Sequence, residues 1–171
     1  MNSNNQTPGS SSSVEQITNN ATSWIGHRNY DNKDIVMGQT FMATTDGNVH
    51  AIEVFSNIVV KPGKVVLTLH AFDLQEKKWG PSLGSSSVEF NYTSNGKWVA
   101  FNLPGLHLVK GNTYGFKLES SDTYVGVGEA AGSARQPPFK TGQVWNFTYN
   151  KQAPEAYSYF SLAFKVDLKA A

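Results

Sequence analysis

Two glycine-containing motifs in the sequence have the residue types of known chemical sites. Residues 80–84, Gly-Pro-Ser-Leu-Gly, match the pattern G-x-S-x-G, which exposes a serine nucleophile where a strand turns sharply into a helix. Residues 126–132 imitate a glycine-rich loop that binds dinucleotide phosphates at the start of a helix. Neither motif leads into a predicted helix, since a serine run follows the first and Pro137-Pro138 follow the second. We therefore interpret residues 80–84 as a surface turn and residues 126–132 as a loop leaving a strand.

The titratable residues show no spacing that is typical of catalysis or of a transition-metal site. The chain has no cysteine, which excludes disulfides, thiolate metal ligands and a cysteine nucleophile. No two histidines stand at the H-x-H or H-x-x-x-H spacing of a zinc site; the four are His27, His50, His70 and His107. Glycoside hydrolysis needs two carboxylates that face each other, and the acidic residues are scattered. We therefore favour a non-catalytic protein over a jelly-roll glycoside hydrolase or polysaccharide lyase.

An oxygen-rich segment, Asp-Asn-Lys-Asp at residues 31–34, precedes a predicted strand. Calcium takes about six to eight oxygen ligands, typically from carboxylates and backbone carbonyls of such loops. Asp31 and Asp34 are therefore weak candidates for a structural Ca²⁺ site, although their spacing fits no EF-hand and a solvated turn is the simpler interpretation. No other cofactor is predicted.

The aromatic residues provide the best sequence signal for a binding site. The chain has 4 Trp, 7 Tyr and 10 Phe, and indole and phenol rings can stack on the flat C–H faces of sugar rings. Many phenylalanines, Phe72 among them, occupy alternating strand positions and are assigned to the core. Trp79 is assigned to a loop between two lysines and Gly80-Pro81. The ligand-binding candidates are Trp79, Arg135, Trp145, Tyr149, Tyr157 and Tyr159, and packing in the core or at its rim is the alternative for each ring.

The elements that must position these residues are short strands with alternating apolar and polar residues. Residues 64–73 and 113–120 show this alternation most clearly, and Gly, Pro, Asn or Asp closes most segments. This pattern predicts an all-β protein, an antiparallel β-sandwich with jelly-roll topology. Residues 87–92 are expected to pair with residues 97–103 across a turn. Residues 129–142 have no periodicity, which predicts a long loop that is either functional or disordered.

The domain organisation follows from length and composition. A chain of 171 residues is one domain by size, and we assign the single sandwich domain to residues 23–171. Residues 1–22 are predicted to be a flexible tail or linker, because their first part is rich in Ser, Asn and Gly. This linker character favours an extracellular or cell-surface module, with a cytoplasmic protein as the alternative. The start has neither the basic nor the apolar region of a signal peptide.

The charge and hydropathy of the chain argue against nucleic acid and membranes as partners. Charged residues make up 16% of the chain and the net charge is +1, so no electrostatic feature favours nucleic acid. No apolar stretch is long enough to span a bilayer, and membrane insertion is not expected.

Several strand motifs occur in a familiar order between residues 35 and 168. They are Gly38-Gln39-Thr40-Phe41-x-Ala43, Val65-x-Leu67-x-Leu69, Trp98-x-x-Phe101-x-Leu103, Leu108-x-x-Gly111-x-x-Tyr114-x-Phe116-x-Leu118 and Gly142-x-x-Trp145. The order resembles the jelly-roll modules of bacterial extracellular proteins, both carbohydrate-binding-module-like and choice-of-anchor-like. The resemblance implies a non-catalytic role that is often glycan-binding, lectin-like or adhesive, sometimes with a structural Ca²⁺.

These observations favour a secreted module that binds carbohydrate through aromatic stacking. The alternative partner is another protein chain, bound by a structural, adhesive or assembly module with exposed aromatic residues and strand edges.

Overall fold

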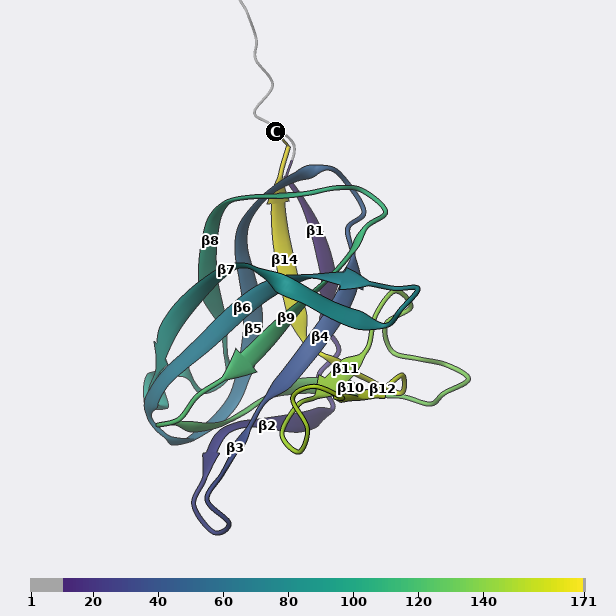
Figure 1. The fold of residues 1–171 in the computed structure, drawn as a ribbon. Coiled ribbons are helices and arrows are strands. Elements are labelled where there is room, and N and C mark those ends of the chain that lie inside the picture. Colours follow the sequence, from purple (N-terminus) through teal and green to yellow (C-terminus); the bar gives the residue numbers. More distant parts are fainter. Residues whose placement is uncertain (1–10, 171) are drawn as a thin grey trace, which may run out of the picture.

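The computed structural model describes residues 11–170, which form two antiparallel β-sheets packed face to face (Figure 1). The predicted all-β fold and antiparallel β-sandwich are confirmed, while the jelly-roll topology stays a prediction. The one helical element in this range is a short 3-10 turn, η1 (Tyr92–Ser94). In the stretch from residue 11 to 170, no helix has the length and apolar character that crossing a bilayer would require.

Sheet A contains both ends of the described chain. Its strands lie in the spatial order β1 (Ser11–Gln16), β14 (Phe164–Lys169), β5 (Gly47–Lys61), β10 (Tyr124–Ala131), β2 (Ala21–Arg28) and β3 (Lys33–Ile35). Two further strands join it off this path: β8 (Lys97–Leu108) pairs with β5, and β13 (Phe160–Leu162) pairs with β10.

Sheet B carries the surface on which the candidate site lies. Its strands lie in the order β12 (Glu155–Tyr157), β11 (Val144–Asn146), β4 (Met37–Met42), β9 (Thr113–Glu119), β6 (Gly63–Asp73) and β7 (Lys78–Phe90). Antiparallel pairing places β4 and β9 at the centre of the sheet, with β6 on one side and β11 on the other.

The main core fills the space between the two sheets. Phe41 of β4 and Phe116 of β9 are fully buried and meet Phe164 of β14, with ring centroids 6.0 and 5.7 Å from its ring. Burying a side chain of this size contributes roughly 1.5–3 kcal/mol to stability. The alternation seen in the sequence is therefore the consequence of two sheets that each turn one face inward.

The prediction of a tail over residues 1–22 is wrong for its second half. Residues 11–16 form β1, which pairs with β14 from Ser11–Lys169 to Gln16–Phe164, and β2 begins at Ala21. Val14 is only 5% exposed and packs in the main core. The serine-rich composition suggested a linker. The segment is nevertheless a strand, because β14, distant in the sequence, provides backbone hydrogen-bond partners for it. The part of the predicted tail in residues 1–10 lies outside the described residues.

The predicted loop over residues 129–142 is shorter than expected. Strand β10 continues to Ala131, so the connection to β11 spans residues 132–143. The ring of Phe139 packs edge-on against Phe164, 5.2 Å between centroids. Gly142 passes so close to β4 that a β-carbon there would lie 1.7 Å from the carbonyl oxygen of Thr40. The loop is therefore anchored directly over sheet B.

Candidate functional site

A second cluster of aromatic side chains covers part of the outer face of sheet B. We call it the outer cluster, and its members are Val36, Phe72, Trp79, Trp145 and Phe147. Strand β4 shows why it forms: Met37 and Phe41 point into the main core, while Gly38 and Thr40 lie on the opposite face. The cluster is thus separated from the main core by the sheet itself.

Trp79 lies at the centre of the outer cluster. It belongs to strand β7 and pairs with Phe72 of β6, so its prediction as a loop residue is wrong. Its ring meets Phe147, Phe72 and Trp145 edge-on, with centroids 5.0, 5.7 and 6.0 Å away. Its Nε1 is buried and has no hydrogen-bond partner among the described residues.

Trp145 connects the outer cluster to the neighbouring loop. It lies on β11 and is 5% exposed. Its Nε1 donates a hydrogen bond of 3.4 Å to Oγ1 of Thr40. Trp145 is buried and Trp79 is half-buried, so both rings primarily pack against their neighbours.

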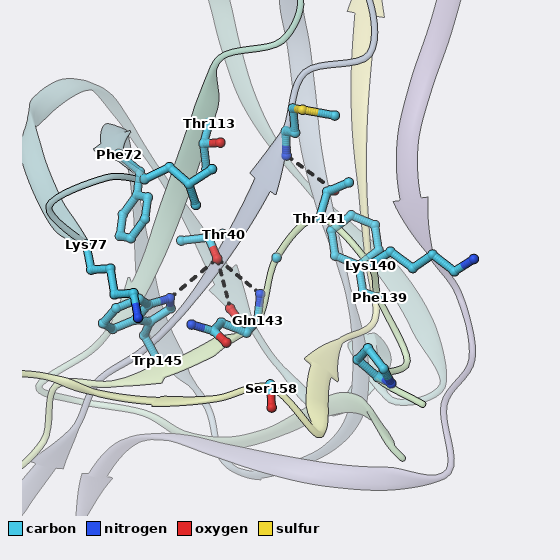
Figure 2. A pocket seen from close by; sticks show the side chains of 14 residues that line it. Thr40, Phe72, Lys77, Thr113, Phe139, Lys140, Thr141, Gln143, Trp145 and Ser158 are labelled. Atoms are coloured by element: carbon cyan, nitrogen blue, oxygen red, sulfur yellow. Dashed lines mark hydrogen bonds between the residues drawn. The ribbon is translucent and has the colours of Figure 1, made fainter. Parts of the chain in front are cut away.

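A pocket of about 410 Å³ lies between the outer cluster and the loop of residues 132–143 (Figure 2). Its walls are mainly apolar and aromatic, formed by Met42, Phe72, Leu74, Pro137, Phe139 and Trp145. Pockets of this size that combine apolar walls with a few polar groups commonly bind small molecules. The volume and the lining of this pocket therefore fall in the range of small-molecule sites.

Thr40 holds one side of this pocket together. Its hydroxyl donates to the carbonyl of Gln143 at 3.3 Å and accepts from the Gln143 backbone N–H at 3.1 Å. It also accepts from Trp145, and Figure 2 shows these three bonds converging on one oxygen. A hydroxyl can donate one bond and accept two, so Thr40 has no capacity left for a ligand.

Five other polar side chains that line the pocket make no side-chain hydrogen bond to another residue between 11 and 170, so they are free to bind a ligand. These residues are Lys77, Thr113, Lys140, Gln143 and Ser158. The residues that line the pocket include no Asp, Glu or His, and two of them are lysines. The pocket can therefore donate hydrogen bonds and attract negative charge, but it lacks the carboxylate pair of a glycoside hydrolase.

Two titratable residues, one on β9 and one on β6, border the outer cluster next to Trp79. Burial lowers the pKa of Lys117, whose Nζ lies 4.4 Å from the ring centroid of Phe147. Burial also lowers the pKa of His70, whose ring is 5.7 Å from Trp79. The two nitrogens of His70 contact the Thr68 hydroxyl and the Gly80 carbonyl, so this histidine is held in place.

The predicted site residues do not form one site. Tyr157 and Tyr159 group with Phe160 where the chain passes from β12 to β13, with Tyr159 and Phe160 centroids 4.6 Å apart. Tyr149 is 68% exposed beneath the ammonium of Lys33. Arg135 is exposed on the loop and does not line the 410 Å³ pocket. The structure thus brings Trp79 and Trp145 together in the outer cluster and Tyr157 and Tyr159 together at a separate place.

Some pocket residues escaped the sequence interpretation. Phe72 was assigned to the core because it alternates with buried residues, yet it faces the outer cluster. Thr40 and Gln143 gave no signal, since their contact joins positions 103 apart in the chain. Phe139 is the one missed residue with a usable sequence signal, because it is an aromatic residue within the aperiodic loop.

Both carboxylates of the oxygen-rich segment at residues 31–34 pair with basic side chains. Asp31 pairs with Arg28, whose Nε lies 2.9 Å from Oδ1, and this hydrogen bond lowers the pKa of Asp31. Asp34 Oδ1 lies 2.7 Å from Nδ1 of His27. Within the part of the chain that the structure describes, no group of three or more acidic or histidine side chains could hold a metal ion. A structural Ca²⁺ stays a prediction.

The two glycine motifs have no catalytic surroundings. Residues 80–84 lie within β7, so they form strand rather than a surface turn, and the Ser82 hydroxyl donates to the Gly84 carbonyl at 3.3 Å. Most of residues 126–132 belongs to β10. Both motifs match by composition only, because an extended strand cannot form the required turn into a helix.

Comparison with known proteins adds no family or relative to this description. No protein-family model matches the chain, and a search of curated proteins finds no match.

Proposed function

We propose that this protein is a non-catalytic carbohydrate-binding module and that it binds its ligand in the pocket beside the outer cluster. One observation carries the proposal: the pocket combines aromatic walls with uncommitted hydrogen-bonding side chains and has no carboxylate in its lining. Sugar rings present apolar C–H faces and many hydroxyls, so they need both kinds of surface at once.

The pocket walls indicate how a saccharide would bind. The edge of Trp145 and the rings of Phe72 and Phe139 provide the apolar surface. The Gln143 amide and the Thr113 hydroxyl can donate to and accept from sugar hydroxyls. Because these groups come from three strands and a loop, the fold fixes their positions before the ligand arrives, which lowers the entropic cost of binding.

The charge of the pocket favours an acidic saccharide. Lys77 and Lys140 are both exposed lining residues, and no ion pair among residues 11–170 involves either of them. An ammonium group forms strong charge-assisted hydrogen bonds with carboxylate or sulfate oxygens. A uronic acid or a sulfated sugar therefore fits better than a neutral hexose.

A glycan array with neutral, uronic-acid and sulfated glycans tests the proposal, followed by calorimetry on the best ligand. Lys77→Gln and Gln143→Ala should each weaken binding by about tenfold, since each removes one or more hydrogen bonds to the ligand. Lys97→Gln, on β8 of the other sheet, serves as the control and should bind like the wild type. The absence of any glycan binding, or equal binding by all variants, would refute the proposal.

A second candidate function is assembly with another protein chain. Trp24 and Ile58 are 37% and 44% exposed, and both lie over Gly126 on the outer face of sheet A. Exposed apolar side chains that adjoin one another mark interaction surfaces. Sedimentation of the wild type and of Ile58→Ser tests this role: a self-associating wild type and a monomeric variant would support it, and a monomeric wild type would rule out self-association.

A further inference from the structure

A second pocket, of about 290 Å³, opens at the edge of the sandwich and contains a buried acid. Glu129 and Ser23 line it from sheet A, and Met37 and Val144 line it from sheet B. Tyr157 of β12 belongs to the same lining. None of its lining residues is shared with the 410 Å³ pocket, so it is a separate place on the molecule.

The position of Glu129 follows from the alternation of β10. Val125 and Val127 point into the main core, and Glu129 follows them in the same phase. Only 6% of Glu129 is exposed, although its carboxyl is hydrophilic. Ser23 of the neighbouring strand β2 lines the same pocket as this carboxyl. A carboxylate that is removed from water in this way normally has a cation or several donors beside it.

No such cation is present beside Glu129. Among residues 11–170, neither of the two ion pairs includes it. Arg28 of β2 lines the same pocket, but its guanidinium is already paired with Asp31. The hydroxyl of Tyr157 donates to Glu155 at 2.5 Å.

The other elements around the pocket bring no charge. Strands β4, β11 and β13 contribute Met37, Asn146 and Phe160, and Tyr124 comes from β10 itself. The carboxyl of Glu129 thus lacks a counter-charge on every side, while the aromatic rings of Tyr157 and Phe160 stand in the same pocket.

We propose that this pocket binds a ligand that carries a protonated primary amine, with the ammonium on Glu129 and the body of the ligand against Tyr157 and Phe160. An ammonium group supplies the missing positive charge and three hydrogen-bond donors. It is also attracted to the faces of aromatic rings. A compact body is required, because the pocket has room for a group of about the size of one ring.

The pH dependence of binding distinguishes this ligand from a neutral one. Burial raises the pKa of Glu129 to about 7. Since only the ionised carboxylate attracts an ammonium ion, affinity for an amine should rise as the pH increases through 7. A neutral hydroxyl ligand of the same shape should show a much smaller change.

Matched ligand pairs test the proposal by calorimetry or by NMR titration. The pairs are benzylamine with benzyl alcohol and butylamine with butanol. At about pH 8, we expect one or more amines to bind at least about tenfold more tightly than the paired alcohol, as for a charge-assisted hydrogen bond. Glu129→Gln should abolish this preference, because the amide keeps the shape and loses the charge.

A control variant and a folding check make the outcome decisive. Glu15→Gln changes an exposed acid on β1, at the opposite edge of sheet A, and should leave amine binding unchanged. Near-UV circular dichroism shows whether Glu129→Gln remains folded, and the pH profile of wild-type binding provides an independent readout if it does not. Equal binding of amines and alcohols, no amine binding at about pH 8, or amine binding that decreases as the pH rises through 7 would each overturn the proposal.

Discussion

The indole ring of Trp79 rests directly on Gly115 of strand β9. A β-carbon at position 115 would lie 2.4 Å from Cζ3 of that ring, closer than any real contact. Gly38 on the adjacent strand is similarly covered, with the same ring at 3.0 Å. The outer cluster can therefore lie flat on sheet B only because two neighbouring strands lack side chains beneath it. The pocket depends on this arrangement, since Phe72 and Trp145 pack against Trp79.

Gly115→Ala should displace Trp79 and destabilise the protein by about 1–3 kcal/mol, the range observed for overpacked sites. The ring is rigid and is confined by Phe72, Trp145 and Phe147, so it cannot move aside without disturbing the cluster. Urea unfolding measures the loss. In a Trp79→Ala background the same substitution should cost almost nothing, and a cost that persists there would show that the glycine matters for another reason.

Thr40→Val should loosen the loop of residues 132–143, because it removes the hydroxyl that bonds Gln143 twice and Trp145 once. The Gln143 carbonyl keeps the backbone N–H of Thr40 as a donor, but the Gln143 N–H and the Trp145 Nε1–H lose their acceptor, which should cost about 1–3 kcal/mol. Limited trypsin digestion reads out the loop, since Arg135 and Lys140 are exposed within it.

Thr141→Val is the matched control for this prediction, because that hydroxyl accepts a single bond, from the Met42 N–H at 3.4 Å. It should increase cleavage much less than Thr40→Val. Equal cleavage rates in the two variants would contradict the role assigned to Thr40.

Glu129→Gln should stabilise the protein above pH 7 and have little effect on stability below about pH 4. The folded-state pKa of Glu129 is raised to about 7 from an unfolded value of 4.5, so the folded protein holds more protons between these values. Stability therefore falls as the pH rises from 4.5 to 7, and the glutamine variant avoids this loss.

The gain at about pH 8 should be at most about 3 kcal/mol, measured by urea unfolding. Glu15→Gln, on the exposed side of β1, should show no such pH-dependent gain. Identical pH profiles for wild type and Glu129→Gln would mean that the carboxyl is not buried in solution.

Val14→Asp should destabilise the protein by more than about 3 kcal/mol, because it puts an unpaired charge where Val14 is 5% exposed. A tail residue in this position would tolerate the change. Thermal unfolding of Val14→Asp distinguishes a buried strand residue from a tail residue at this position. The control Glu15→Ser, on the exposed side of β1, should stay within about 0.5 kcal/mol of the wild type.

The alternation of apolar and polar residues predicted individual strands well. Residues 64–73 and 113–120 correspond to β6 and β9 almost residue for residue. Partners were harder to predict. Residues 87–92 and 97–103 were expected to form a hairpin, yet β7 pairs with β6 and β8 pairs with β5, in different sheets. A turn between two strands limits their distance in the chain but does not compel them to share a ladder.

The candidate site shows the same division. Its aromatic residues and its loop were recognisable, because residue type and the lack of periodicity are local properties. Their grouping was not recognisable: Trp79 and Trp145 meet across sheet B, whereas Tyr157 lies at the sandwich edge near Glu129. The buried acid itself escaped notice, since its neighbours in sequence resemble an ordinary strand end.

The all-β class thus follows from the sequence alone, because a period of two in side-chain direction is a property of each extended segment by itself. Which of the two faces of a strand is covered, and by what, depends on segments far away in the chain. Phe41 and Thr40 are neighbours, yet one packs in the main core and the other supports the pocket. Packing of the two sheets and of the loop over sheet B makes that distinction, because burial is a property of the assembled fold.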